Sequence, residues 1–143
     1  MVARRASAVW EGTLKDGKGT VSLGSGAFEG AYSFASRFER GTGTNPEELI
    51  GAAYAGCFSQ ALSDDLTEAG FPPERIDTEA VVRLEQVEGG FAITEITIKT
   101  TGVVADIDAE TFQKLAEGAK DGCPVSKALQ GVEKHLEAEL KNA

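Results

Sequence analysis

Apolar and polar positions alternate in short runs through the first third of the chain. The runs cover Ala6–Leu14, Lys18–Leu23 and Ala27–Phe34, and turn residues separate them at Asp16-Gly17 and Gly24–Gly26. Short β-type runs joined by tight turns are typical of neighbouring antiparallel strands. The pattern therefore predicts an N-terminal β-meander.

A long helix is predicted next, because the character of the chain changes at Thr44–Glu48. Thr44 or Asn45 can cap the helix, a proline suits its first turn, and two glutamates suit the positive end of its dipole. Apolar or small residues surround the helix on nearly every side over positions 49–62, so we expect its first half to be buried. Gly70 and two following prolines mark its end.

Two further strands are predicted at Thr78–Val87 and Phe91–Val104, joined by a hairpin turn at Gly89-Gly90. In the second strand the apolar residues first occupy odd positions and later even ones. One extra residue would restore a single buried face, so we expect a bulge near Thr94-Glu95.

The last part of the chain is predicted to contain a helix over Asp108–Lys120 and a helical turn that starts at Cys123-Pro124. The tail is ambiguous. The apolar residues from Leu129 to Leu140 fit either a helix or a strand, and periodicity alone leaves both open.

Composition narrows the class of protein. The chain has 143 residues, which predicts a single domain over residues 1–143. Its formal net charge of −9 repels nucleic acid and anionic lipid, so neither is an expected partner. No stretch approaches the ~18 apolar residues of a membrane span, and the N-terminus lacks a secretory signal. These features favour a cytoplasmic protein, in which two cysteines are expected to be free, catalytic or metal-binding.

The two cysteines differ in their surroundings. Cys57 lies inside the apolar helix, where a cysteine is often just a small core residue. Cys123 precedes a proline at a helix start, where free backbone N–H groups favour a thiolate, although an exposed turn residue is the simpler alternative. Local rules therefore predict that Cys123 is the more acidic thiol. Together with His135 the cysteines give too few ligands for a closed structural zinc site, so no metal is expected.

Arg37 and Glu47 are candidates for the activating groups. Each has a plainer interpretation, as a surface arginine and as an ordinary first-turn acid. An arginine oriented by a carboxylate, however, lowers the pKa of a nearby thiol and can polarise an O–O bond. A thiolate that attacks a hydroperoxide becomes a sulfenic acid, and a second cysteine can condense with that acid to form a disulfide.

Several motifs together resemble the OsmC/Ohr family of osmotically induced and organic-hydroperoxide-resistance proteins, and the OsmC branch most closely. The motifs that carry the resemblance are Gly43–Leu49, Ala53–Phe58 and Gly122–Ser126, supported by Trp10–Gly12, Gly17–Val21, Arg37–Glu39 and Ile76–Thr78. They span nearly the whole chain in the family's order.

The resemblance implies an α+β fold that forms an intertwined homodimer, with antiparallel sheets wrapped around central helices, a C-terminal strand, and an active site at the subunit interface. It implies that Cys57 attacks the peroxide, that Cys123 resolves the sulfenic acid, and that Arg37 and Glu47 assist. It further implies reduction of organic hydroperoxides in stress defence, with no cofactor and with an external dithiol, of lipoyl type, as reductant.

Helix geometry adds a prediction of its own. Cys57 lies ten residues after Glu47, which is about 15 Å along a helix at 1.5 Å per residue. We therefore expect the Glu47 that serves a given Cys57 to come from the partner subunit. Two other functions stay open from the sequence: a module that binds a small hydrophobic ligand or a protein without catalysis, and a thiol-disulfide oxidoreductase.

Overall fold

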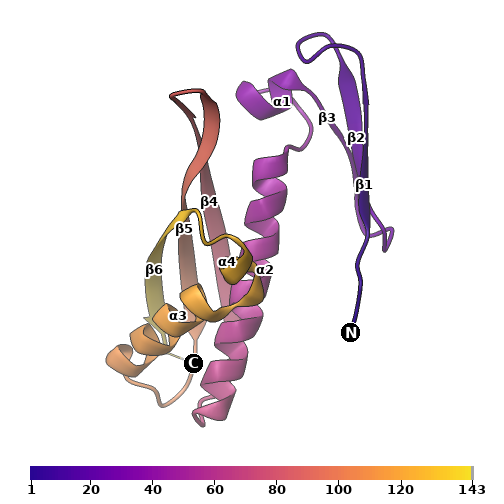
Figure 1. The fold of residues 1–143 in the computed structure, drawn as a ribbon. Coiled ribbons are helices and arrows are strands. Elements are labelled where there is room, and N and C mark those ends of the chain that lie inside the picture. The colour runs from indigo at the N-terminus through magenta and orange to yellow at the C-terminus, as the bar shows by residue number, and fades with distance from the viewer. Residues whose placement is uncertain (143) are drawn as a thin grey trace. The chain divides into compact units, whose positions relative to one another are not determined.

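The computed structural model describes residues 1–142. The chain divides into two compact units, Met1–Leu49 and Ile50–Ala143, and each unit contains its own three-stranded sheet (Figure 1). Among residues 1–142, no helix has both the length and the apolar character that crossing a membrane requires.

The first unit contains the predicted meander. Its antiparallel strands are β1 (Ala6–Glu11), β2 (Lys18–Leu23) and β3 (Glu29–Tyr32), in that order across the sheet. The register places Gly19 of β2 between Trp10 and Tyr32 on the outer strands. A Cβ on Gly19 would lie 2.4 Å from the Tyr32 ring, so only glycine lets the two aromatic rings approach to 5.2 Å.

A short helix, α1 (Phe34–Phe38), follows the meander and corrects the sequence analysis, which extended the third strand to Phe34 and predicted no helix here. The helix is set by local polar groups. The Ser33 hydroxyl accepts a hydrogen bond from the Ser36 backbone N–H, and the Ser36 hydroxyl accepts one from the Ser33 N–H. This reciprocal cap ends the strand and starts the helix.

The predicted long helix is α2 (Pro46–Glu68), and the prediction is confirmed at both ends. Asn45 caps its start, because the Asn45 side-chain oxygen accepts a hydrogen bond of 2.7 Å from the Glu48 N–H. Gly70 ends the helical segment with φ +94°, a conformation that glycine adopts at little cost.

The second unit has a sheet of β4 (Arg75–Val87), β5 (Gly90–Val103) and β6 (Glu133–Lys141), in that order. The hairpin and its bulge are confirmed. Arg83 pairs with Glu95, whereas Leu84 pairs with Ile93, so Thr94 is the extra residue. The bulge keeps the apolar side chains on both sides of it on one face of the sheet.

The ambiguous tail is a strand, as the resemblance implied, but it corrects the expectation of purely antiparallel sheets. Strand β6 runs parallel to β5, so the second sheet is mixed. A parallel pair needs a crossover connection, which α3 (Ala109–Gly122) and α4 (Pro124–Ala128) supply here.

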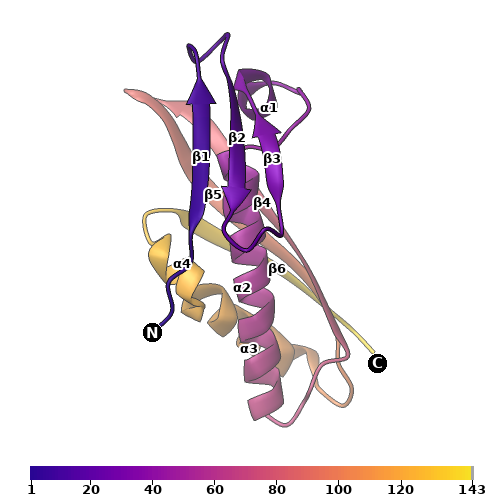
Figure 2. The same ribbon diagram turned by 90° about the vertical axis from the view of Figure 1, so that its right-hand side faces the viewer.

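The core of the second unit lies where α2, α3 and one face of the sheet meet (Figure 1 and Figure 2). Its largest fully buried side chains come from all three elements: Tyr54, Phe58, Leu62 and Leu66 from α2, Phe112 from α3, and Ile96 and Ile98 from β5. Each such side chain contributes about 1.5–3 kcal/mol by leaving water. This core fixes the position of the helix that carries Cys57.

Candidate active site

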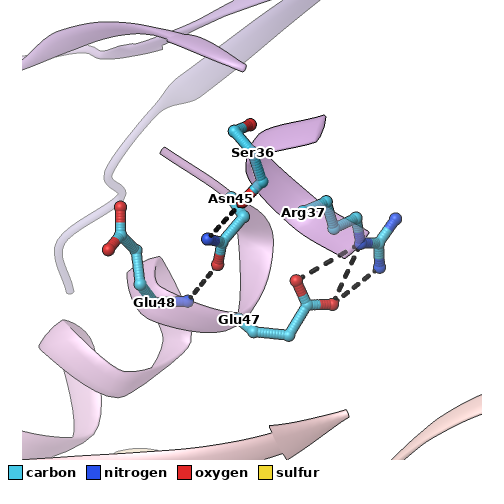
Figure 3. A network of polar contacts seen from close by, with 5 residues as sticks. All are labelled: Ser36, Arg37, Asn45, Glu47 and Glu48. Carbon is cyan, nitrogen blue, oxygen red and sulfur yellow. Dashed lines mark hydrogen bonds and ion pairs between the residues drawn. The ribbon is translucent and has the colours of Figure 1, made fainter. Parts of the chain in front are cut away.

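An ion pair joins Arg37 of α1 to Glu47 in the first turn of α2 (Figure 3). The Arg37 Nη2–H donates to Glu47 Oε1 with an N···O distance of 2.7 Å. The Nε–H donates to both carboxylate oxygens, with N···O distances of 3.1 and 3.2 Å. The Glu47 side chain is 9% exposed and that of Arg37 is 37% exposed. The carboxylate is thus nearly enclosed, while part of the guanidinium remains accessible.

A set of hydrogen bonds fixes α1 to the start of α2 and so orients this pair. The buried Ser36 hydroxyl donates to the Thr44 carbonyl at 2.7 Å, and the Asn45 side-chain amide donates to the Ser36 carbonyl at 3.1 Å. Asn45 therefore caps α2 with its oxygen and holds α1 with its nitrogen (Figure 3). Since both helices share these bonds, the Arg37–Glu47 pair is held in one orientation.

Arg37 also lines a cavity of about 220 Å³ in the first unit. The other residues of the cavity wall are mostly aromatic or aliphatic: Trp10, Leu14, Tyr32, Ser33, Phe34 and Phe38. The guanidinium carbon lies 5.2 Å from the centre of the Phe38 ring. The cavity thus combines an apolar wall with one positive group.

The two cysteines meet in the second unit. Cys57 lies on α2 and is half-buried, Cys123 is buried, and both are free thiols. The two side chains lie close enough to interact, because the Cys57 thiol raises the pKa of the Cys123 thiol. The two cysteines are therefore neighbours in the fold, although 66 positions separate them in the chain (123 − 57).

Cys123 occupies the junction of two helices, as the C-cap of α3 and the N-cap of α4. Its sulfur accepts a hydrogen bond of 3.4 Å from the Ser126 N–H. Burial nevertheless raises the pKa of the Cys123 thiol, and the neighbouring Cys57 sulfur raises this pKa further. The expectation that Cys123 is an acidic thiol is therefore wrong, because loss of water outweighs the favourable helix start.

Tyr54 is a residue of this region that the sequence analysis missed. It is fully buried one turn before Cys57, and its hydroxyl donates to the Lys120 carbonyl at 2.8 Å. Burial raises the pKa of Tyr54 to about 12. The spacing of three residues between Tyr54 and Cys57, which places both on one side of a helix, was the available signal.

The four predicted site residues thus form two pairs of neighbours. Arg37 and Glu47 meet in the first unit, within one chain, and Cys57 and Cys123 meet in the second. The first pair is a guanidinium held by a carboxylate, and the second is two neighbouring thiols.

A third cluster lies on β5 and β6, where ligand atoms of Glu95, Glu133 and His135 fall within 4.8 Å of one another. The Arg83 guanidinium already contacts the Glu95 carboxylate at 3.2 Å. A cation would have to displace or tolerate this positive group, so we assign no metal to the cluster.

Comparison with known proteins connects these pairs to a family. The family model described as OsmC-like protein matches residues 39–137. Peroxiredoxin OsmC of Escherichia coli strain K12 is 52% identical over 142 residues, which are 99% of each chain. The match includes both cysteine segments, so the likeness extends over the whole candidate site.

Solved structures agree with the fold. The organic hydroperoxide resistance protein OhrB of Bacillus subtilis superposes with a TM-score of 0.73 at 32% identity, covering 96% of this chain and 98% of that one. An organic hydroperoxide resistance protein from Elizabethkingia anophelis gives a TM-score of 0.74 at 26% identity, with 98% and 99% covered.

Proposed function

Because this chain belongs to the OsmC-like protein family, we propose that it is a cysteine-based peroxidase that reduces organic hydroperoxides in stress defence. Cys57 is the attacking thiol and Cys123 the resolving thiol. The observation that carries the proposal is that a half-exposed Cys57 neighbours a buried Cys123 closely enough to raise its pKa. A substrate can reach the Cys57 sulfur but not the buried Cys123 sulfur. In this proposal Cys123 is placed to form a bond with Cys57 after the substrate has reacted.

The chemistry proceeds in two steps. The Cys57 thiolate attacks one peroxide oxygen, the O–O bond breaks with its electron pair on the other oxygen, and that alkoxide takes a proton and leaves as an alcohol. Cys57 is then a sulfenic acid. The Cys123 thiol attacks its sulfur, water leaves, and a Cys57–Cys123 disulfide remains. An external dithiol returns both residues to thiols, and no bound cofactor takes part.

Arg37 stabilises the reacting charges in this proposal, and Glu47 holds Arg37 in place. A guanidinium favours the thiolate over the thiol and stabilises the negative charge that develops on the leaving oxygen. The apolar cavity beside Arg37 supports an organic substrate, since aromatic walls bind a hydrocarbon group better than they bind hydrogen peroxide.

The active unit is a homodimer with its sites at the subunit interface. One face of α2 supports this assignment, because it exposes small residues over which a second helix could pack closely, namely Ala52, Ala53 and Gly56. The ten residues between Glu47 and Cys57 amount to about 15 Å of helix, beyond the reach of a guanidinium that is bound to Glu47. The Arg37–Glu47 pair of one subunit therefore serves the Cys57 of its partner.

The family resemblance suggests the reductant, and composition suggests the compartment, the single domain and the partners that are excluded. The reductant is a lipoyl-type dithiol, the protein acts in the cytoplasm, and residues 1–143 work as one domain. A net charge of −9 disfavours nucleic acid and anionic membranes as partners.

The test is consumption of cumene hydroperoxide in the presence of dithiothreitol. Wild type should turn over, Cys57→Ser should be inactive, and Cys123→Ser should retain turnover because dithiothreitol can reduce the sulfenic acid directly. Ser59→Ala is the control, since it removes a neighbouring hydroxyl on α2 that bonds Thr78 rather than a cysteine. Turnover by Cys57→Ser would refute the peroxidase assignment. Disulfide exchange without hydroperoxide consumption would indicate an oxidoreductase instead.

A further inference from the structure

Tyr54 connects the two cysteine segments at three points. It lies three residues before Cys57 on α2. Its hydroxyl donates to the carbonyl of Lys120, three residues before Cys123, at 2.8 Å. The side chain of Ser126, three residues after Cys123, is close enough to lower the pKa of the phenol. The phenol therefore holds the chain on both sides of the resolving cysteine against the helix of the attacking cysteine.

The backbone hydrogen bonds at Cys123 do not supply this connection. The Cys123 N–H donates to Ala119 and its sulfur accepts from Ser126, so both backbone contacts lie within the α3–α4 segment itself. They shape the junction of α3 and α4, but they do not attach it to α2. Tyr54 is fully buried and lies on the face of α2 that enters the core, where a hydrogen bond exchanges little with water.

We propose that Tyr54 is a positioning residue for the second step of the reaction, and that its hydroxyl holds Cys123 within reach of the Cys57 sulfenic acid. The proposal rests on the assigned roles of the two cysteines. Disulfide formation requires the two sulfurs to approach to about 2.05 Å with a restricted torsion, so a small drift of the α3–α4 junction slows this step. The first step involves only Cys57 and the peroxide, and is independent of the Tyr54 hydroxyl.

The consequence concerns the fate of the sulfenic acid. A sulfenic acid that is not resolved can react with a second peroxide to give a sulfinic acid, which a dithiol does not reduce. By keeping Cys123 in place, the Tyr54 hydroxyl sets the ratio of disulfide to sulfinic acid. This ratio measures positioning rather than folding, because a variant that is merely less stable but still folded leaves it unchanged.

The experiment uses Tyr54→Phe, which keeps the buried ring and removes only the hydroxyl. The full-length protein is mixed rapidly with tert-butyl hydroperoxide and quenched over time. Sulfenic acid is trapped with dimedone, and sulfenic acid, disulfide and sulfinic acid at Cys57 are quantified by mass spectrometry. We expect sulfenic acid to form within about twofold of the wild-type rate, and disulfide formation to slow about tenfold, the effect of about 1.4 kcal/mol. The sulfinic fraction should rise accordingly.

Two further variants keep the result decisive. Ser126→Ala removes the hydroxyl that interacts with the phenol and should shift the same ratio in the same direction, so it serves if Tyr54→Phe does not fold. Ser59→Ala, a hydroxyl deletion on α2 away from Cys123, should leave the ratio unchanged. Wild-type disulfide rates in both Tyr54→Phe and Ser126→Ala would overturn the proposal. Failure of the underlying peroxidase assignment would look different, since no sulfenic acid would then form at Cys57 in the wild type.

Discussion

Replacing Glu47 by glutamine tests whether the ion pair of the first unit serves the peroxide reaction. Glutamine keeps the size of the side chain and one acceptor oxygen, but it removes the negative charge and presents an N–H₂ donor where the Arg37 fork needs an acceptor. At least one of the three N···O contacts between 2.7 and 3.2 Å is then lost. Arg37 should consequently leave its fixed orientation.

The size of the effect follows from burial. A hydrogen bond to a charged group is worth about 1.5–3 kcal/mol, and the lower end applies here because the Arg37 side chain is 37% exposed and partly screened. If the disoriented guanidinium stabilises the transition state by about 1–2 kcal/mol less, the rate of Cys57 oxidation falls about 5- to 30-fold. The rate of disulfide formation should stay as in the wild type.

Glu48→Gln is the matched control. Glu48 is the next residue of the same helical turn and its side chain is exposed, so this variant removes the same charge from the helix start without touching Arg37. Pseudo-first-order oxidation of Cys57 by tert-butyl hydroperoxide, followed by dimedone labelling, measures both variants. If Glu47→Gln reacts as fast as Glu48→Gln, the guanidinium is not oriented by Glu47 for catalysis, and this part of the proposed mechanism is wrong.

Two further predictions concern the core and the buried thiol. Gly102→Ala should lower the free energy of unfolding by about 1–3 kcal/mol, because the new Cβ would lie 2.7 Å from the Phe112 ring. Gly118→Ala, in open space on α3, should raise the free energy of unfolding by about 0.5–1 kcal/mol. Urea unfolding of both variants checks this contrast, and equal shifts would contradict it. The pKa of the Cys123 thiol is raised above its ordinary value of 9.0, so in the folded protein this thiol stays neutral to a higher pH. Iodoacetamide at pH 8 should therefore label Cys57 well before Cys123. The same pKa shift contributes stability that is fully present below pH 9 and is lost as pH rises through the folded pKa. Over that range the free energy of unfolding should fall by at most about 1.4 kcal/mol per pH unit, and Cys123→Ser should lack this fall. Earlier labelling of Cys123, or an identical alkaline slope in Cys123→Ser, would contradict the pKa assignment.

Sequence was sufficient wherever a local rule acts alone. The cap at Asn45 and the proline after it predicted the start of α2, and the two glycines at 89 and 90 predicted the hairpin between β4 and β5. The change from odd to even apolar positions located the bulge at Thr94. In each case the residues that decide the structure are neighbours in the chain.

Sequence failed where distant groups decide. Helix α1 has only five residues, and its Ser36 hydroxyl is held by the carbonyl of Thr44, so no periodicity could reveal it. The parallel pairing of β6 depends on β5, more than thirty positions earlier, and an alternating pattern does not specify the direction of a strand. The acidity of Cys123 was misjudged for the same reason, because burial by the rest of the core is invisible from its immediate neighbours.

The place of Cys123 between α3 and α4 makes one substitution unusually informative. Serine is among the residues that start helices best, and its oxygen is a stronger acceptor than sulfur for the backbone N–H three residues ahead. A serine at position 123 therefore preserves the architecture of the bend while removing the one atom that can be oxidised there. A defect in a living cell of that variant, once it is shown to fold as the wild type does, would report the loss of redox chemistry.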